Sequence, residues 1–289
     1  MYVITGSSGA LFGRPVLGQL RRLAPGARIV AGTRDPGSAA ELAATGAEVR
    51  RVDFDDPGSL AAAFAGATAV LVNGTNYGTP AGRRGAQHAA AIRAAAGAGA
   101  ARVVYVSWPD PELYPLPLMA DFAGSEALLR ELSPGATILR TTYGVAQAVG
   151  RDVAGAVASG VLTAPAGRAR TTPAHIDDLA EATARVLTSD EHGGRLYTLT
   201  AADSIGWDDL AGLAATISGQ PVRYQPAGDD EFTSAAAAQG IPAELAGVLL
   251  GVYHAFRAGW TGTPTGDLAA ILGRAPRPAL DAVAAVTGG

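Results

Sequence analysis

The chain opens with Tyr2-Val3-Ile4-Thr5-Gly6-Ser7-Ser8-Gly9-Ala10-Leu11-Phe12-Gly13, an apolar run that leads into a glycine-rich turn. After the turn, apolar residues recur on one face of an expected helix, at Val16, Leu17, Leu20 and Leu23. A strand, a glycine turn and a helix in this order let backbone N–H groups approach a pyrophosphate, and the helix dipole favours the anion. The sequence therefore predicts a dinucleotide site whose first contacts are Gly6, Ser8, Gly9, Leu11, Phe12 and Gly13.

The rest of the first half alternates apolar runs of strand length with helical periodicity, which is typical of βαβ units around a parallel sheet. The expected strands are Tyr2–Thr5, Arg28–Gly32, Glu48–Val52, Ala69–Val72, Arg102–Ser107 and Thr137–Arg140. Asp56-Pro57 and Thr79-Pro80 are expected to start two helices, the second running from Ala81 to about Ala96. The predicted fold class is α/β, with a Rossmann-type doubly wound parallel sheet.

The alternation loosens from about residue 150, where connections become longer and richer in proline and glycine. We expect residues 1–150 to form the dinucleotide-binding domain and residues 151–289 a smaller, mostly helical substrate lobe, partly interwoven with the first. The elements expected there are a helix from Asp177 to Leu187, a strand at Tyr197–Leu199, and helices at Trp207–Ile217, Asp229–Ala238, Ala243–Ala258, Gly266–Leu272 and Pro276–Val286.

Composition excludes several kinds of chemistry. The chain has no cysteine, which rules out disulfides, thiolate nucleophiles and zinc–thiolate sites. All 22 basic residues are arginine, which rules out a Schiff base, a Walker-type phosphate loop and the Tyr-x-x-x-Lys dyad of many dehydrogenases. The four histidines show no spacing with carboxylates that suggests metal binding, so we predict no metal site.

Charge and hydropathy limit the partners. A net charge of −4 argues against a nucleic-acid partner. No apolar run reaches the ~18 residues that a membrane span needs. Because the first residues show no basic region followed by a cleavage site, we expect a cytoplasmic protein, monomeric or homodimeric, that acts on a small molecule.

The end of the second strand bears on the choice of cofactor. Arg34 follows this strand at the place where the 2′-phosphate of NADP would lie, so NADPH is favoured. Asp35 could instead reach the ribose hydroxyls of NAD. Ligands gather at the carboxyl ends of parallel strands. The other expected cofactor contacts are therefore Asp53 and Phe54 beside the adenine, Asn73 and Gly74 under the ribose and nicotinamide, and Ser107 at the fifth strand.

The chain resembles the NmrA-like branch of atypical short-chain dehydrogenases/reductases, and within it the bacterial NADPH:quinone oxidoreductases. The likeness covers nearly the whole length. It rests on Ile4-Thr5-Gly6-Ser7-Ser8-Gly9, Gly32-Thr33-Arg34-Asp35-Pro36, Val52-Asp53-Phe54-Asp55-Asp56, Val104-Tyr105-Val106-Ser107, His175-Ile176-Asp177-Asp178-Leu179-Ala180, Gly219-Gln220-Pro221-Val222-Arg223-Tyr224 and Gly273-Arg274-Ala275-Pro276. The resemblance implies NADP(H) on the glycine turn, on Arg34 and on the fourth and fifth strand tips, with the substrate over the nicotinamide.

Two features depart from the family pattern. The family turn usually places a third glycine three residues after Gly9, whereas this chain has Phe12 there and Gly13 one residue later. This departure leaves open whether the phosphate site is kept, reshaped or lost, and Arg34 with the other strand tips favours retained binding. The family also often carries a Lys or His in the helix after the fifth strand, but residues 119–126 of this chain contain neither.

The sequence favours an acceptor that needs little acid catalysis. Reduction of an ordinary ketone needs a positioned proton donor, whereas hydroquinone oxygens are weakly basic and can take protons from water. A quinone-like or aromatic acceptor is therefore the expected substrate. The candidate donors are Tyr143, Tyr114 and Asp121.

Two other functions remain open at this point. One is an NADP-sensing regulator that turns over nothing. The other is a non-redox cyclase, lyase or isomerase of small-molecule metabolism that kept the fold, which Phe12 would favour.

Overall fold

The computed structural model describes residues 1–9, 11–74, 79–80, 82–114, 116 and 118–288. They form two compact units. Unit 1 comprises Met1–Glu112, Leu118–Arg140 and Ile176–Thr198, and unit 2 comprises Leu113–Pro117, Thr141–His175 and Leu199–Gly289. The division into a binding domain at 1–150 and a substrate lobe at 151–289 concerns the roles of the two parts and stays a prediction.

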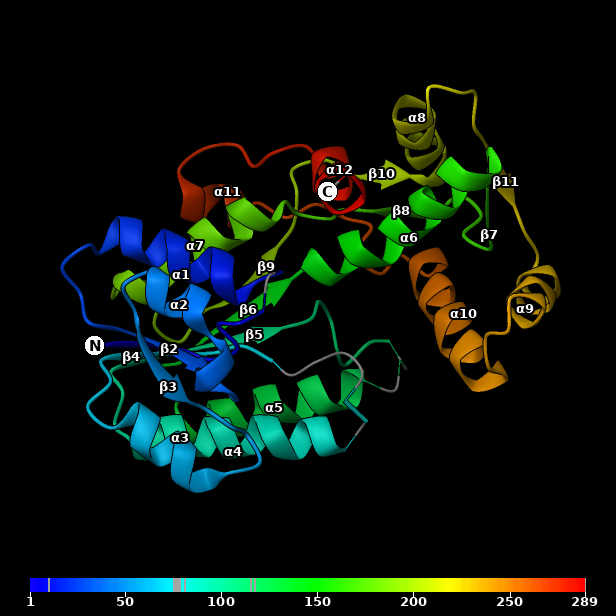
Figure 1. Ribbon diagram of the computed structural model, residues 1–289. Helices are drawn as coiled ribbons and strands as arrows, with labels where there is room; N and C mark the ends of the chain where they lie inside the picture. The colour runs from blue at the N-terminus through cyan, green and yellow to red at the C-terminus, as the bar shows by residue number, and fades with distance from the viewer. Residues whose placement is uncertain (10, 75–78, 81, 115, 117, 289) are drawn as a thin grey trace. The chain divides into compact units, whose positions relative to one another are not determined.

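Unit 1 is built on a seven-stranded sheet in the order β3-β2-β1-β4-β5-β6-β9 (Figure 1). The strands are β1 (Tyr2–Ile4), β2 (Ile29–Thr33), β3 (Glu48–Arg51), β4 (Ala69–Val72), β5 (Arg102–Ser107), β6 (Thr137–Thr141) and β9 (Leu196–Leu199). From β3 to β6 all neighbouring strands run parallel. The doubly wound sheet is confirmed, and each expected strand lies within one residue of its observed bounds.

Helices cover both faces of this sheet. The helical elements of unit 1 are α1 (Gly13–Leu23), η1 (Pro36–Ser38), α2 (Ala40–Ala44), α3 (Pro57–Phe64), α4 (Arg83–Gly97), α5 (Met119–Leu132) and α7 (Ile176–Thr188). Helix α1 packs beside α7 on one face, and α3, α4 and α5 pack side by side on the other (Figure 1). The core under the second group includes Phe64, Ile92, Tyr105, Phe122 and Leu129. These apolar layers hold the carboxyl ends of the strands in place, which is where a ligand site forms in such sheets.

One of the two expected helix caps is present and the other is not. Asp56 caps α3 as expected, since its Oδ1 accepts the backbone N–H groups of Gly58 (3.0 Å) and Ser59 (3.2 Å). The expected start of the next helix at Thr79-Pro80 is wrong. Helix α4 begins at Arg83, after Gly82 with a φ of 78°, because a left-handed residue interrupts the helix before that point.

Unit 2 is mostly helical, as expected. Its elements are α6 (Tyr143–Ser159), β7 (Val161–Ala164), β8 (Arg170–Thr171), β10 (Ile205–Gly206), α8 (Trp207–Ser218), β11 (Arg223–Pro226), α9 (Asp229–Ala238), α10 (Ala243–Arg257), α11 (Asp267–Leu272) and α12 (Ala279–Thr287). Strands β10 and β8 pair antiparallel, and β11 pairs with β7 in parallel. The sequence patterns indicated the later helices but missed α6 and these short strands.

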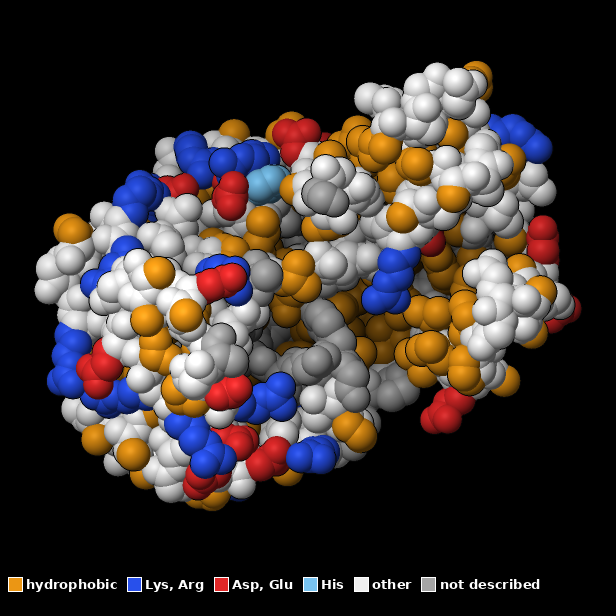
Figure 2. Space-filling view, viewed as in Figure 1, with side chains coloured by type: hydrophobic (Ala, Val, Ile, Leu, Met, Phe, Trp, Pro, Cys, Tyr) orange, Lys and Arg blue, Asp and Glu red, His pale blue; other side chains and the backbone are white. Residues whose placement is uncertain are grey.

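On the face drawn in Figure 2, acidic and basic side chains of unit 1 are mixed, and no large patch of one charge is seen. Among the described residues, no helix combines the length and the apolar character needed to cross a bilayer.

Candidate functional site

The glycine turn carries the chain from β1 into α1. Gly6 has a φ of 62°, in the left-handed region where glycine avoids the steric penalty of a Cβ. The Ser7 N–H donates to the carbonyl of Gly32 at 3.0 Å, and its hydroxyl donates to the carbonyl of Ile4 at 2.7 Å. The Gly9 N–H donates to the carbonyl of Gly6 at 3.1 Å. The turn is therefore held by the protein's own hydrogen bonds.

Gly13 makes the close contact that the family assigns to the third glycine. A Cβ on this residue would lie 2.1 Å from the carbonyl oxygen of Gly6 and 2.9 Å from the Cα of Ser7. No side chain fits there, because both neighbours are backbone. Phe12 is 2% exposed and directly precedes the first residue of α1. Its ring is accommodated inside the protein, and the helix packs onto the turn at Gly13. Whether the turn holds a phosphate stays a prediction.

The start of α1 suits an anion. Its first turn, Gly13-Arg14-Pro15-Val16, carries no carboxylate to oppose the positive end of the helix dipole. Leu11, 46% exposed, and the exposed Ser8 lie in the turn before it. The close approach at Gly13 and the helix N-terminus together fit a bound pyrophosphate.

The end of β2 carries the arginine expected at the 2′-phosphate. Arg34 is exposed directly after this strand. Asp35 caps the short helix η1, where its Oδ1 accepts the N–H of Gly37 at 3.1 Å. The Asp35 carboxylate therefore stabilises the turn after β2. The role of Arg34 at the ribose end of the cofactor stays a prediction.

Strands β1 and β4 meet where the strand order reverses, which is the usual place of a ligand in such sheets. The Asn73 N–H donates to Thr5 Oγ1 at 2.9 Å, and the Thr5 hydroxyl donates to the Asn73 carbonyl at 3.2 Å. Gly74 follows, and a Cβ on it would lie 3.3 Å from Nε2 of His88. The tips of β1 and β4 thus form one rigid edge beside the glycine turn.

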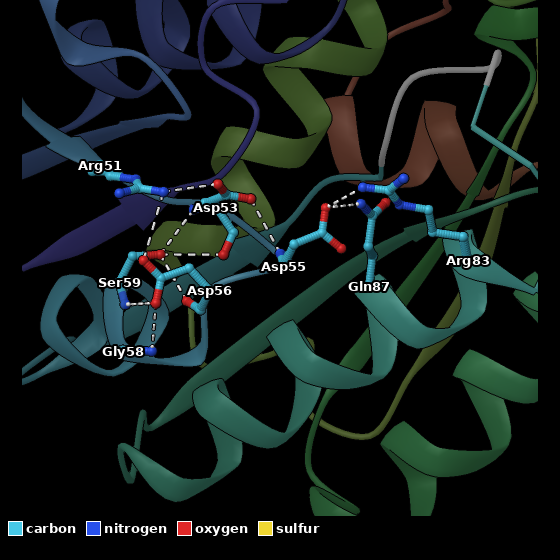
Figure 3. Close-up of polar contacts among 8 residues, drawn as sticks. All are labelled: Arg51, Asp53, Asp55, Asp56, Gly58, Ser59, Arg83 and Gln87. Atoms are coloured by element: carbon cyan, nitrogen blue, oxygen red, sulfur yellow. Dashed lines mark hydrogen bonds and ion pairs between the residues drawn. The ribbon is translucent and has the colours of Figure 1, made fainter.

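The loop after β3 is drawn in Figure 3. Asp53 pairs with Arg51, with 3.0 Å between Oδ2 and Nη2, and its Oδ1 accepts the N–H of Asp55 at 3.1 Å (Figure 3). Phe54 is partly buried against the core beneath the sheet. Asp55 accepts hydrogen bonds from Arg83 (2.9 Å) and Gln87 (2.8 Å) on α4. The loop is therefore fastened both to β3 and to α4.

The end of β5 leads into a buried charge cluster that the sequence reasoning missed. The Ser107 hydroxyl donates to Glu126 at 2.7 Å and the residue is fully buried. The predicted contact of Ser107 with a cofactor stays a prediction. Arg140 on β6 donates to both oxygens of Glu126, at 3.0 and 2.9 Å. It also pairs with Asp110 and Glu112. The sequence signal for this cluster was an arginine within the strand Thr137–Thr141. A buried guanidinium needs a partner of opposite charge nearby.

His88 lies in a second buried group. Its Nδ1 is 2.8 Å from the hydroxyl of Tyr105, and its ring is fully buried. Burial, together with the positive charge of Arg84, lowers the pKa of His88 to about 3. The imidazole is therefore neutral at physiological pH and does not act there as a charged group.

The three candidate proton donors have different surroundings. Asp121, in unit 1, accepts the N–H of Gly82 with both carboxylate oxygens, at 3.1 and 3.2 Å. Gly82 is the residue that directly precedes α4. Tyr114, in unit 2, has its ring centroid 6.1 Å from that of Trp260. Tyr143, also in unit 2, is the partly buried first residue of α6. Their catalytic roles stay predictions.

Unit 2 contains a partly buried carboxyl group, Asp152, that the sequence analysis did not single out. Asp152 on α6 accepts hydrogen bonds from the Tyr253 hydroxyl at 2.6 Å and the Trp207 indole N–H at 2.7 Å. Burial raises its pKa to about 6. It therefore joins three helices, α6, α8 and α10, through one side chain.

Known proteins are similar to this chain in sequence and in fold. Residues 6–131 match the model of a family described as NAD(P)H-binding. Quinone oxidoreductase 2 of Escherichia coli strain K12 is 31% identical over 249 residues, which are 86% of this chain and 85% of that protein.

Two solved structures extend the likeness over the full chain. An NADPH-dependent quinone oxidoreductase from Escherichia coli, complexed with NADPH, has a TM-score of 0.88 and 28% identity, covering 99% of both chains. Triphenylmethane reductase of a Citrobacter species, complexed with NADP(H), has a TM-score of 0.85 and 27% identity, covering 98% of this chain and 99% of that one. The glycine turn, the doubly wound sheet and these likenesses together place the chain in the NmrA-like atypical short-chain dehydrogenase/reductase family, beside quinone oxidoreductase 2.

Proposed function

We propose that this protein is an NADPH-dependent reductase of quinones or related aromatic acceptors. The observation that carries the proposal is the turn closed by Gly13, where any Cβ would meet the Gly6 carbonyl. That contact supports a phosphate cradle that is kept in spite of Phe12, the residue that had favoured a non-redox function. The likeness to quinone oxidoreductase 2 supports the choice of acceptor.

The residues of unit 1 would hold the cofactor as follows. The turn and the N-terminus of α1 receive the pyrophosphate, Arg34 receives the 2′-phosphate, and the Asn73-Gly74 edge lies under the nicotinamide end. The bound dinucleotide supplies a hydride, and a quinone that takes up this hydride and a proton leaves as the hydroquinone while the dinucleotide is oxidised. The protein's main contribution is positioning, because the product oxygens can take protons from water.

The cofactor assignment is tested by titrating NADPH and NADH into wild type, Arg34→Ala and Arg51→Ala. Arg51 is the matched control, an exposed arginine at the end of the next strand. Loss of a charge-assisted contact of ~1.5–3 kcal/mol should weaken NADPH binding by about 10- to 150-fold in Arg34→Ala. NADH affinity should change little. Equal affinities for NADPH and NADH in the wild type would refute the role of Arg34.

Turnover is tested by following NADPH oxidation with a simple benzoquinone and with an aliphatic ketone. We expect the quinone to be reduced far faster, because no dedicated acid is needed for it. Tight NADPH binding without oxidation would favour an NADP-sensing regulator instead. A cytoplasmic location and a monomeric or homodimeric state belong to the proposal, and light scattering of the purified protein checks the latter.

A further inference from the structure

Arg140 has more anionic partners than its burial requires. Glu126, itself 1% exposed, binds the guanidinium with both carboxylate oxygens, at 3.0 and 2.9 Å, and so supplies the buried counter-charge. Arg130 shares Glu126, but its side chain is 54% exposed and water solvates its charge. Asp110 and Glu112 bind Arg140 in addition, with 3.2 Å between Nη1 and Oδ1 and 2.9 Å between Nη2 and Oε2. What these two added contacts do is hold the segment that carries the two acids.

That segment is Trp108–Glu112, here called the strap, and its backbone is strained. Asp110 has a φ of 45°, in the left-handed region that residues with a Cβ rarely adopt. Pro111 follows, and the residue before a proline normally has an extended backbone. Strain of this kind persists only where the surroundings enforce it, and it gathers at functional sites. The two ion pairs with Arg140 are the contacts that enforce it here.

The strap begins where the proposed function requires a substrate. It directly follows β5, which pairs with β4, and β4 adjoins β1 where the strand order reverses. Ligands of such sheets bind outside the carboxyl ends of the strands at this point. Trp108 fixes the first end of the strap by packing on Phe122, with 6.3 Å between the ring centroids. Arg140 fixes the other end, so the strap follows one set course beside the expected substrate position.

We propose that Arg140 is a positioning residue for the quinone or aromatic substrate: through Asp110 and Glu112 it holds the strap, and the strap forms part of the wall on which the substrate binds. The inference rests on the proposed function and adds to it the part of the chain that sets substrate affinity. Release of the strap weakens substrate binding. It leaves NADPH binding unchanged, because the glycine turn and Arg34 lie on other elements.

The test uses the double variant Asp110→Asn/Glu112→Gln, which removes both outer ion pairs and leaves the contacts between Glu126 and Arg140 in place. Asparagine tolerates a left-handed backbone, and the two side chains are 42% and 52% exposed, so the fold is not at risk. With a simple benzoquinone, KM should rise ~fivefold or more while kcat changes little. The Kd of NADPH, from calorimetric titration, should stay the same.

Asp190→Asn is the matched control. Asp190 is an exposed carboxylate that pairs with Arg102 at the start of β5, the end of that strand opposite to the strap. Its loss should change neither the KM for benzoquinone nor the Kd of NADPH.

Limited digestion with chymotrypsin gives a second reading that needs neither cofactor nor substrate. Leu113, the residue after the strap, is 68% exposed, and cleavage after it is identified by fragment mass. We expect slow cleavage there in the wild type and in Asp190→Asn, and cleavage several times faster in the double variant. A loosened strap enters the protease more readily, because cleavage requires local unfolding.

Equal cleavage rates would show that the ion pairs do not hold the strap, and an unchanged KM would show that the strap does not serve the substrate. Weaker NADPH binding by the double variant would assign the strap to the cofactor instead. Each of these results would overturn the inference and leave the reductase proposal intact. A wild type that binds NADPH and reduces no quinone would overturn the proposed function, and the inference with it.

Discussion

Replacing Asp152 by asparagine should remove most of the pH dependence of stability of unit 2 in the mildly acidic range. Asp152 accepts hydrogen bonds from Tyr253 and Trp207 but lies in surroundings that raise its pKa from 3.8 to about 6. Burial is the main cause, and the two hydrogen bonds oppose it only in part. The folded protein therefore holds the proton over a pH range in which the unfolded chain has released it.

The sign follows from linkage. Between pH 3.8 and about 6 the folded state binds more protons at Asp152 than the unfolded state, so the free energy of unfolding falls as pH rises through this window. A shift of about two pKa units corresponds to about 3 kcal/mol. Wild type should thus lose up to about 3 kcal/mol between pH 3.5 and 7 through this one group, and Asp152→Asn should lose none of it.

Urea unfolding at a series of pH values, followed by tryptophan fluorescence, measures the effect because Trp207 bonds directly to Asp152. The difference between wild type and variant at each pH isolates this carboxyl from all others. Asp229→Asn is the control. Arg257 first, and then His254, lower the pKa of Asp229 to about 2, so its stabilising contribution disappears only below pH 3.8. A wild-type minus Asp152→Asn difference that is constant from pH 3.5 to 7 would refute the reasoning.

Other expected outcomes concern the turn, the charge cluster and the candidate donor. Gly13→Ala should weaken NADPH binding by more than about tenfold in a titration, because its Cβ would fall 2.1 Å from the Gly6 carbonyl and only backbone could yield; unchanged affinity would contradict the preformed cradle. Glu126→Gln leaves Arg140 without its buried counter-charge and should lower the free energy of unfolding by ~3–5 kcal/mol, as read from urea midpoints. Tyr143→Phe should change quinone turnover only modestly; a loss of several orders of magnitude in kcat would show that this hydroxyl is an essential donor.

The sequence by itself determined the fold class and most of unit 1. The strands and helices follow local patterns with periods of 2 and 3.6 residues, and the glycine turn is a short local motif. Such patterns can be read directly from the sequence. The same holds for Asp56, whose cap needs only neighbours two and three residues away. The sequence also predicts Arg34 at the ribose end, because the end of β2 lies beside the ribose in sheets of this type.

Tertiary structure alone decided how the site is completed. Gly13 makes the close contact with Gly6 because the start of α1 packs onto the turn, whereas counting along the family turn puts that glycine at position 12. Asp53 and Asp55 look equivalent in sequence. In the structure, Asp53 accepts a hydrogen bond from its own loop, whereas Asp55 accepts one from Arg83 on α4. The Glu126–Arg140 pair depends on a helix and a strand that meet only across the fold. Long-range pairs such as these are set by how packed elements align side chains in space, and that alignment leaves little trace in local sequence periodicity.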